Sequence, residues 1–116
     1  MLSQEQPKFN SVLVQAVHEG LDSIGPSLSD AVLFHLQWTN AIRSSPSLID
    51  PEAFDDGLKR LFGYGARVIE RRILELLYEK LEAPREIKVD FKFSEEVEKA
   101  QKLLGSMGIL ITKNPQ

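Results

Sequence analysis

The sequence lacks several residue types on which common protein chemistries depend. It has no cysteine, which excludes disulfide bonds, thiol nucleophiles and cysteine-based metal sites, and it has two histidines for metal binding or acid–base work. Its longest uncharged run, residues 31–42, is about half the length of a membrane-spanning helix and contains polar side chains. The N-terminal segment does not show the charged and then apolar regions of a signal peptide. We therefore expect a cytoplasmic protein with no membrane span, metal or cofactor.

Charge of one sign is not concentrated anywhere along the chain. The formal net charge is −3 over 116 residues, and no segment forms a basic tail. The chain therefore lacks the overall positive field that is typical of nucleic-acid-binding proteins, although a local basic patch can still bind nucleic acid. The length and the 42% content of hydrophobic residues suit one compact domain with a small appendage.

Four amphipathic helices are predicted in the first part of the chain, because apolar residues recur there at intervals of three and four. The third helix is specified most strongly, since Asp50 can cap it, Pro51 suits its first position and Gly63 can end it. Gly20 interrupts the apolar stripe of the first helix, which indicates close approach of a neighbouring helix. The sequence thus predicts a four-helix domain over residues 9–82, with helices at about 9–24, 27–40, 51–62 and 66–81.

A different pattern follows residue 83. Residues 86–93 alternate polar and apolar side chains, which is typical of a strand with one buried face. A short helix is predicted at about 95–104, and the apolar run 109–112 is interpreted as a second strand. We therefore predict a mainly α protein, α+β overall, with a βαβ appendage over residues 85–112. Two strands alone are marginally stable, so we expect a second copy of the chain to complete the sheet and the protein to be a homo-oligomer.

His35 and Glu70 are polar residues that fall within the apolar arcs of two predicted helices. An isolated buried charge is very unfavourable, so each side chain needs a partner. We predict that His35 and Glu70 form a buried polar pair, either through a shared hydrogen bond or with His35 capping a neighbouring backbone group. The alternative is an acid–base dyad or switch, but the sequence offers no nucleophile or metal ligand as a third member.

The chain contains one basic cluster, around the junction of the third and fourth helices. Arg67 and Arg71 are like charges one helical turn apart, in the first turns of a helix whose dipole disfavours cations there. Such a local conflict can mark a functional surface. We interpret the cluster either as a solvated surface or protein contact, or as a nucleic-acid site with the fourth helix in a groove. The cluster consists of Lys59, Arg60, Arg67, Arg71 and Arg72, and its candidate binding residues are Lys59, Arg67, Arg71 and Arg72.

Three aromatic residues, Phe34, Trp38 and Tyr78, are predicted to lie at an edge of the helical domain. Aromatic side chains at an edge can be interaction hot spots, although most aromatic residues at helical spacing belong to a core. We include Tyr78 among the candidate partner-binding residues. Neither a phosphate-binding loop nor a paired-histidine metal motif occurs in the sequence.

Residues 9–82 resemble the archaeal output domain family first described in Nitrosopumilus. The resemblance implies an all-helical module, often attached to signalling or regulatory domains, with no established activity. Nothing associated with that family covers residues 83–116. The stretches that carry the resemblance are residues 21–25, 34–36, 54–63, 65–74 and 77–81.

Taken together, these patterns predict a non-enzymatic protein-interaction or regulatory module of the output type. Its expected mechanism is surface recognition by the third and fourth helices, with a protein as the partner. The alternative is a nucleic-acid-binding regulator that uses Arg67, Arg71 and Arg72 on a hairpin resembling a helix-turn-helix motif.

Overall fold

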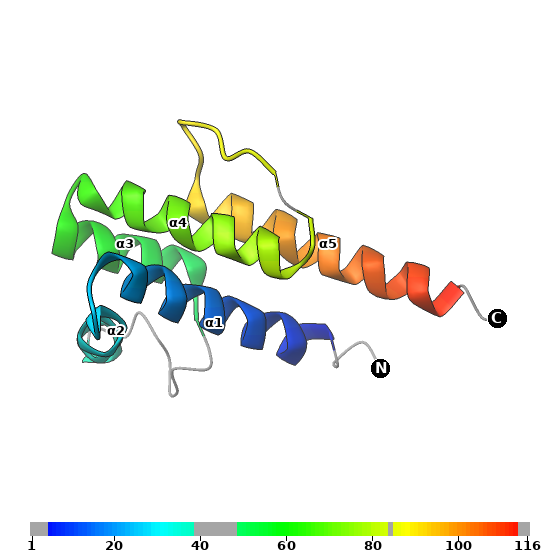
Figure 1. Cartoon of the computed structure of the whole chain (residues 1–116), viewed down its shortest axis with the longest axis horizontal. Helices are drawn as coiled ribbons and strands as arrows, with labels where there is room; N and C mark the ends of the chain where they lie inside the picture. Colours follow the sequence, from blue (N-terminus) through cyan, green and yellow to red (C-terminus); the bar gives the residue numbers. More distant parts are fainter. Residues whose placement is uncertain (1–4, 39–48, 84, 114–116) are drawn as a thin grey trace.

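The computed structural model describes residues 5–38, 49–83 and 85–113, and these residues form a helical protein (Figure 1). No strand occurs in this part of the chain, so the mainly α prediction is confirmed. None of the helices in the described ranges is long and apolar enough to cross a membrane. The helices are α1 (Glu5–Ile24), α2 (Leu28–Trp38), α3 (Pro51–Phe62), α4 (Gly65–Lys80) and α5 (Phe93–Lys113).

Helices α1 and α4 lie side by side and make the most extensive contact between elements, while α2 crosses them near the end of α1 (Figure 1). The missing side chain of Gly20 allows this approach. A Cβ atom at Gly20 would lie 2.6 Å from Ile73 Cγ1, which is too close for a real side chain, and 3.2 Å from Ile73 Cα, which is unusually tight. The predicted close approach at Gly20 is therefore confirmed, with α4 as the neighbouring helix.

The α3–α4 hairpin forms where local signals predicted it. Asp50 caps α3, because its Oδ1 atom accepts hydrogen bonds from the backbone N–H groups of Glu52 and Ala53, at 3.1 and 3.3 Å. Gly63 ends α3 with φ of +57°, a conformation that favours glycine, and its N–H group donates to the Lys59 carbonyl at 2.8 Å. The chain then turns directly into α4.

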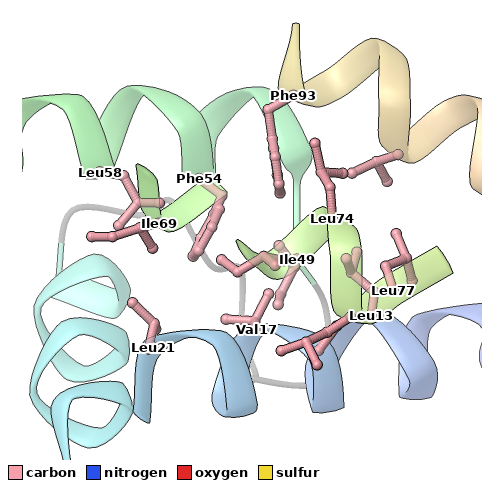
Figure 2. Close-up of a cluster of buried hydrophobic side chains, with 14 of the residues drawn as sticks. Leu13, Val17, Leu21, Ile49, Phe54, Leu58, Ile69, Leu74, Leu77 and Phe93 are labelled. Atoms are coloured by element: carbon pink, nitrogen blue, oxygen red, sulfur yellow. The ribbon is translucent and has the colours of Figure 1, made fainter. Parts of the chain in front are cut away.

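One hydrophobic cluster joins α1, α3, α4 and α5. Figure 2 shows side chains from these helices converging, with Phe93 of α5 reaching toward Phe54 of α3. The two rings are 5.6 Å apart between centroids and tilted by 36°, a favourable aromatic arrangement. Helix α5 therefore belongs to the same core as the hairpin. Its buried apolar residues are Phe93, Val97 and Ala100.

The predicted βαβ appendage is wrong. Residues 85–92, here called the strap, run over α4 without forming a strand and turn at residues 89–90, where the Phe91 N–H group donates to the Lys88 carbonyl at 3.2 Å (Figure 1). Residues 109–112 lie within α5, which continues through Gly105 and Gly108. A short apolar run fits a helix as well as a strand, and each glycine costs a continuing helix only about 1 kcal/mol.

Candidate functional site at the tip of the α3–α4 hairpin

The predicted buried pair of His35 and Glu70 is wrong. Glu70 is 1% exposed, as expected, but His35 lies on the exposed side of α2. Helix α2 packs through only one side of its broad apolar arc, so Ala31, Phe34 and His35 face outward. The apolar residues that α2 buries are Val32, Leu33 and Leu36.

Glu70 pairs instead with Asp55 on the facing helix α3. Burial, and then its hydrogen bond with Asp55, raise the pKa of Glu70 to about 9, so at neutral pH the Glu70 carboxyl group is protonated and its O–H donates a hydrogen bond to the Asp55 carboxylate. Burial also raises the pKa of Asp55, but hydrogen bonds from Glu70 and Lys59 outweigh that effect and hold the pKa below its ordinary value. Lys59 Nζ lies 3.0 Å from Asp55 Oδ2. Glu70 Oε2 has no hydrogen-bond partner among the described residues.

Hairpin register explains this pairing. Asp55 lies eight residues before Gly63 and Glu70 lies seven after it, so the two carboxyl groups meet across the antiparallel helices. Lys59 and Arg67 are each four residues from Gly63, on opposite sides of the turn. They therefore also meet across the two helices, where they line one hollow. Counting outward from the predicted turn would have identified both pairs from the sequence.

Arg67 and Arg71 hold the strap against α4. Arg67 Nη2 donates to the carbonyl oxygens of Val89 and Phe91 at 2.7 and 3.0 Å, and Arg71 Nη1 donates to the Ile87 carbonyl at 2.8 Å. Both guanidinium groups also lie over the Phe91 ring, 4.3 and 5.7 Å from its centroid. The like-charge pair therefore supplies donors to an extended backbone segment that has no neighbouring strand among the residues the structure describes.

The charges of these two arginines are not cancelled by this arrangement. Their acceptors are neutral carbonyl groups and a ring face, whereas Arg72, on the exposed face of α4, forms an ion pair with Glu75 at 3.5 Å. The basic cluster predicted from the sequence therefore does not act as one surface. Arg67 and Arg71 have a structural role, whereas Arg72 lies on the surface.

Tyr78 is buried, which contradicts its assignment as a partner-binding residue. Its hydroxyl group donates to Glu96 Oε1 at 2.9 Å and lies 3.1 Å from the Glu96 carbonyl oxygen. Burial, followed by the interaction with Glu96, raises the pKa of Tyr78 to about 12. Phe34 is exposed, as an edge position predicts. The side chain of Trp38 lies outside the described residues.

An open hollow of about 320 Å³ lies at the tip of the hairpin. Among the described residues it is lined by Lys59, Gly63, Tyr64 and Arg67. Tyr64 is 96% exposed although its aromatic ring is large and mostly apolar. The sequence analysis missed Tyr64, yet its position between two glycines in a turn was a signal, because a residue at such a turn has few neighbours to cover it.

Two exposed aliphatic residues extend this surface. Val68 is 67% exposed one helical turn after Tyr64, and Val89, whose carbonyl binds Arg67, is 83% exposed at the turn of the strap. We call these residues together the tip surface; it consists of Lys59, Gly63, Tyr64, Arg67, Val68 and Val89.

Comparisons with known proteins identify no relative. No family model matches the chain, and neither a curated protein nor a solved structure matches it. The resemblance of residues 9–82 to the archaeal output domain family therefore stays a prediction. In the part of the chain that the structure describes, no group of three or more histidine, aspartate or glutamate side chains is placed to hold a metal ion.

Proposed function

We propose that this protein is a non-enzymatic protein-interaction module that recognises a protein partner with its tip surface. The observation that carries the proposal is the 96% exposure of Tyr64 beside a hollow. Tyrosine and arginine are the residues that most often dominate binding energy at protein interfaces. A tyrosine ring that is exposed to water in the turn between two helices buries its apolar area, and so contributes binding energy, when a partner covers it.

The support beneath the tip surface suits a recognition role. Tyr64 immediately precedes α4 and Val68 lies on its first turn, while the opposite face of α4 is packed into the core and α3 joins α4 through the tight turn at Gly63. Arg67 is held by the strap, so its guanidinium group has a defined position. Binding groups that are already ordered lose less conformational entropy on association than groups on a mobile loop.

Nucleic-acid binding is less well supported than protein binding. Of the three arginines nominated for it, Arg67 and Arg71 donate to the strap and Arg72 is ion-paired with Glu75. A basic helix available to a groove would present such side chains freely to phosphates. An output-type regulatory role and a cytoplasmic location stay predictions from the sequence. The argument for self-association through a shared sheet no longer applies, since the described residues contain no strand.

Site-specific photo-crosslinking tests the proposal. A benzophenone amino acid placed at Tyr64 is expected to trap a protein in extracts of the native host, and introducing Val68→Asp beside it should abolish the adduct. The matched control places the same group at Lys102 on α5, whose side chain is 78% exposed and far from the tip in sequence. Equal adducts at the two positions would contradict the proposal, as would a Tyr64 adduct removed by nuclease.

A further inference from the structure

We propose that the tip surface binds an acidic protein segment that inserts an apolar side chain into the hollow. This inference rests on the proposed function and specifies the chemistry of the partner. The partner segment is expected to have an apolar anchor residue and carboxylates beside it, and different features of the tip surface indicate each of these.

The apolar anchor follows from the walls of the hollow. The alkyl stems of Lys59 and Arg67, the ring of Tyr64 and the bare backbone of Gly63 form walls that are chiefly carbon. A volume of about 320 Å³ lies at the small end of the range of about 300–1,000 Å³ for ligand pockets, which suits one large side chain and not an extended ligand. A phosphate would find few N–H donors on such walls, so a peptide side chain fits the hollow better than a nucleotide.

The flanking carboxylates follow from the charge around the hollow. Residues 57–69 contain Lys59, Arg60 and Arg67 and no aspartate or glutamate, although the whole chain has a net charge of −3. The hydrogen bonds that Arg67 makes to the strap go to neutral carbonyl groups and not to a carboxylate. The end of the hairpin is thus a positive region on an acidic protein, and complementary charge favours an acidic partner.

Acidic side chains near the hollow do not make the end of the hairpin negative. Glu70 is protonated at neutral pH, and Asp55 is balanced by the 3.0 Å ion pair with Lys59. Asp90 at the turn of the strap lies between two exposed lysines, Lys88 and Lys92. Against the positive charges of Lys59, Arg60 and Arg67 stand the carboxylates of Asp55 and Asp56, so the end of the hairpin keeps a net positive charge.

Titrations with short synthetic peptides, followed by NMR of the ¹⁵N-labelled full chain, test the inference. The probe is a blocked peptide with a central tryptophan flanked by glutamates; matched peptides carry alanine at the centre or glutamine at the flanks. We expect saturating shifts at the Gly63 and Gly65 amides with the first peptide at low salt. Each matched peptide should bind at least about tenfold more weakly, and added salt should weaken the first peptide markedly because it screens exposed charges.

Two substitutions separate the roles of charge and shape. Lys59→Met keeps the alkyl stem that lines the hollow but removes its charge, and it should weaken the first peptide several-fold. Tyr64→Ala removes a wall and should abolish saturation. Arg72→Met is the matched control, because it removes one exposed positive charge away from the hollow, and it should change affinity by less than about twofold.

The possible results either support or overturn the inference. Equal binding of the glutamate and glutamine peptides would overturn the acidic partner, while photo-crosslinking from Tyr64 would still support protein recognition. No shifts at Gly63 or Gly65 with any peptide at millimolar concentration would also overturn it. Larger shifts with a short DNA duplex than with the peptides, lost in Arg72→Met, would replace the inference with nucleic-acid binding.

Discussion

The α3–α4 hairpin and the segment formed by the strap and α5 pack into one hydrophobic core, but different interactions place them. The hairpin is positioned by apolar side chains at helical spacing and by caps at its ends. The strap buries only Ile87 and Phe91, and the guanidinium groups of Arg67 and Arg71 bind its backbone carbonyls. A helix satisfies its own backbone groups, whereas an extended segment must find external donors.

This difference explains why alternating polar and apolar residues did not produce a sheet. Alternation predicts an extended segment with one face inward, and Ile87, Phe91 and Phe93 do face inward. It does not specify which groups donate to the carbonyl oxygens. Here two arginine side chains take the place of a neighbouring strand, and the turn at residues 89–90 leaves Val89 exposed.

The largest predicted effect concerns the packing of the hairpin against α1. Gly20→Val would place atoms within 3.2 Å of the backbone of Ile73, so α1 and α4 would have to separate. We expect a loss of about 3 kcal/mol in the free energy of unfolding, measured by urea denaturation. Gly25→Ala is the control, because the nearest atom to its new Cβ is 3.9 Å away. Equal stability of the two variants would contradict the packing described.

A second effect concerns the buried carboxyl pair within the hairpin. Unfolded Glu70 ionises near pH 4.5 and folded Glu70 near 9, so the folded state binds more protons between these values. The Glu70 contribution to the free energy of unfolding is therefore fully present below about 4.5 and falls as pH rises toward 9.

Glu70→Gln should remove this pH dependence and stabilise the fold at pH 7 by on the order of 2 kcal/mol. The second amide hydrogen of glutamine lacks an assured acceptor, which offsets part of the gain. Urea denaturation across pH 5–8 measures this change in the free energy of unfolding, with Glu79→Gln on the exposed face of α4 as the control. If the stability of the original protein and that of Glu70→Gln change in parallel across this pH range, Glu70 is not protonated in the fold.

A smaller effect is expected at the strap. Arg71→Met keeps the alkyl stem but removes the hydrogen bonds to the Ile87 and Lys88 carbonyls, at 2.8 and 3.3 Å. We expect a loss of about 1–2 kcal/mol, because these bonds have a charged donor and are partly exposed. Arg72→Met removes only a surface ion pair with Glu75 and should cost about 0–1 kcal/mol. Similar losses in a thermal melt of the two variants would refute the structural role of Arg71.

The smallest effect is at the end of α4, where the hairpin leads into the strap. Glu82 has φ of +57°, in the left-handed region, and the next residue, Ala83, donates its N–H to the Tyr78 carbonyl at 3.0 Å. Glu82→Gly relieves this backbone conformation and should raise the free energy of unfolding by about 1 kcal/mol. Glu79→Gly, inside the helix, should lower it by about the same amount. Differential scanning calorimetry of the two proteins distinguishes these opposite signs.

Much of the hairpin could be predicted from the sequence. The bounds of α3 agree with the prediction and those of α4 differ by one residue at each end, because a cap, a proline and a glycine act locally there. Burial of Glu70 also followed from helical periodicity. Its partner did not follow from the periodicity of one helix, because identifying Asp55 also requires counting residues outward from the turn along both helices. The exposure of His35 depends on which side of α2 meets a neighbour, which is set by the crossing of helices and not by α2 alone.

The strap and the tip surface were harder to predict. Arg67 and Arg71 looked unfavourable in their own helix, and only the path of residues 85–92 shows why they occur together. The exposure of Tyr64 could have been inferred from its place between two glycines, whereas the exposure of Val89 depends on how the strap turns over α4. For the two arginines and for Val89, the missing information is the contact between distant segments.

Residue-resolved hydrogen exchange on the double variant Arg67→Met/Arg71→Met tests most directly whether arginine side chains hold the strap. We expect the amides of residues 87–93 to exchange faster, including the Phe91 N–H that donates to Lys88, while the amides within α3 and α4 keep their protection. Unchanged exchange in the strap, or an equal loss of protection in the strap and the hairpin, would contradict the account.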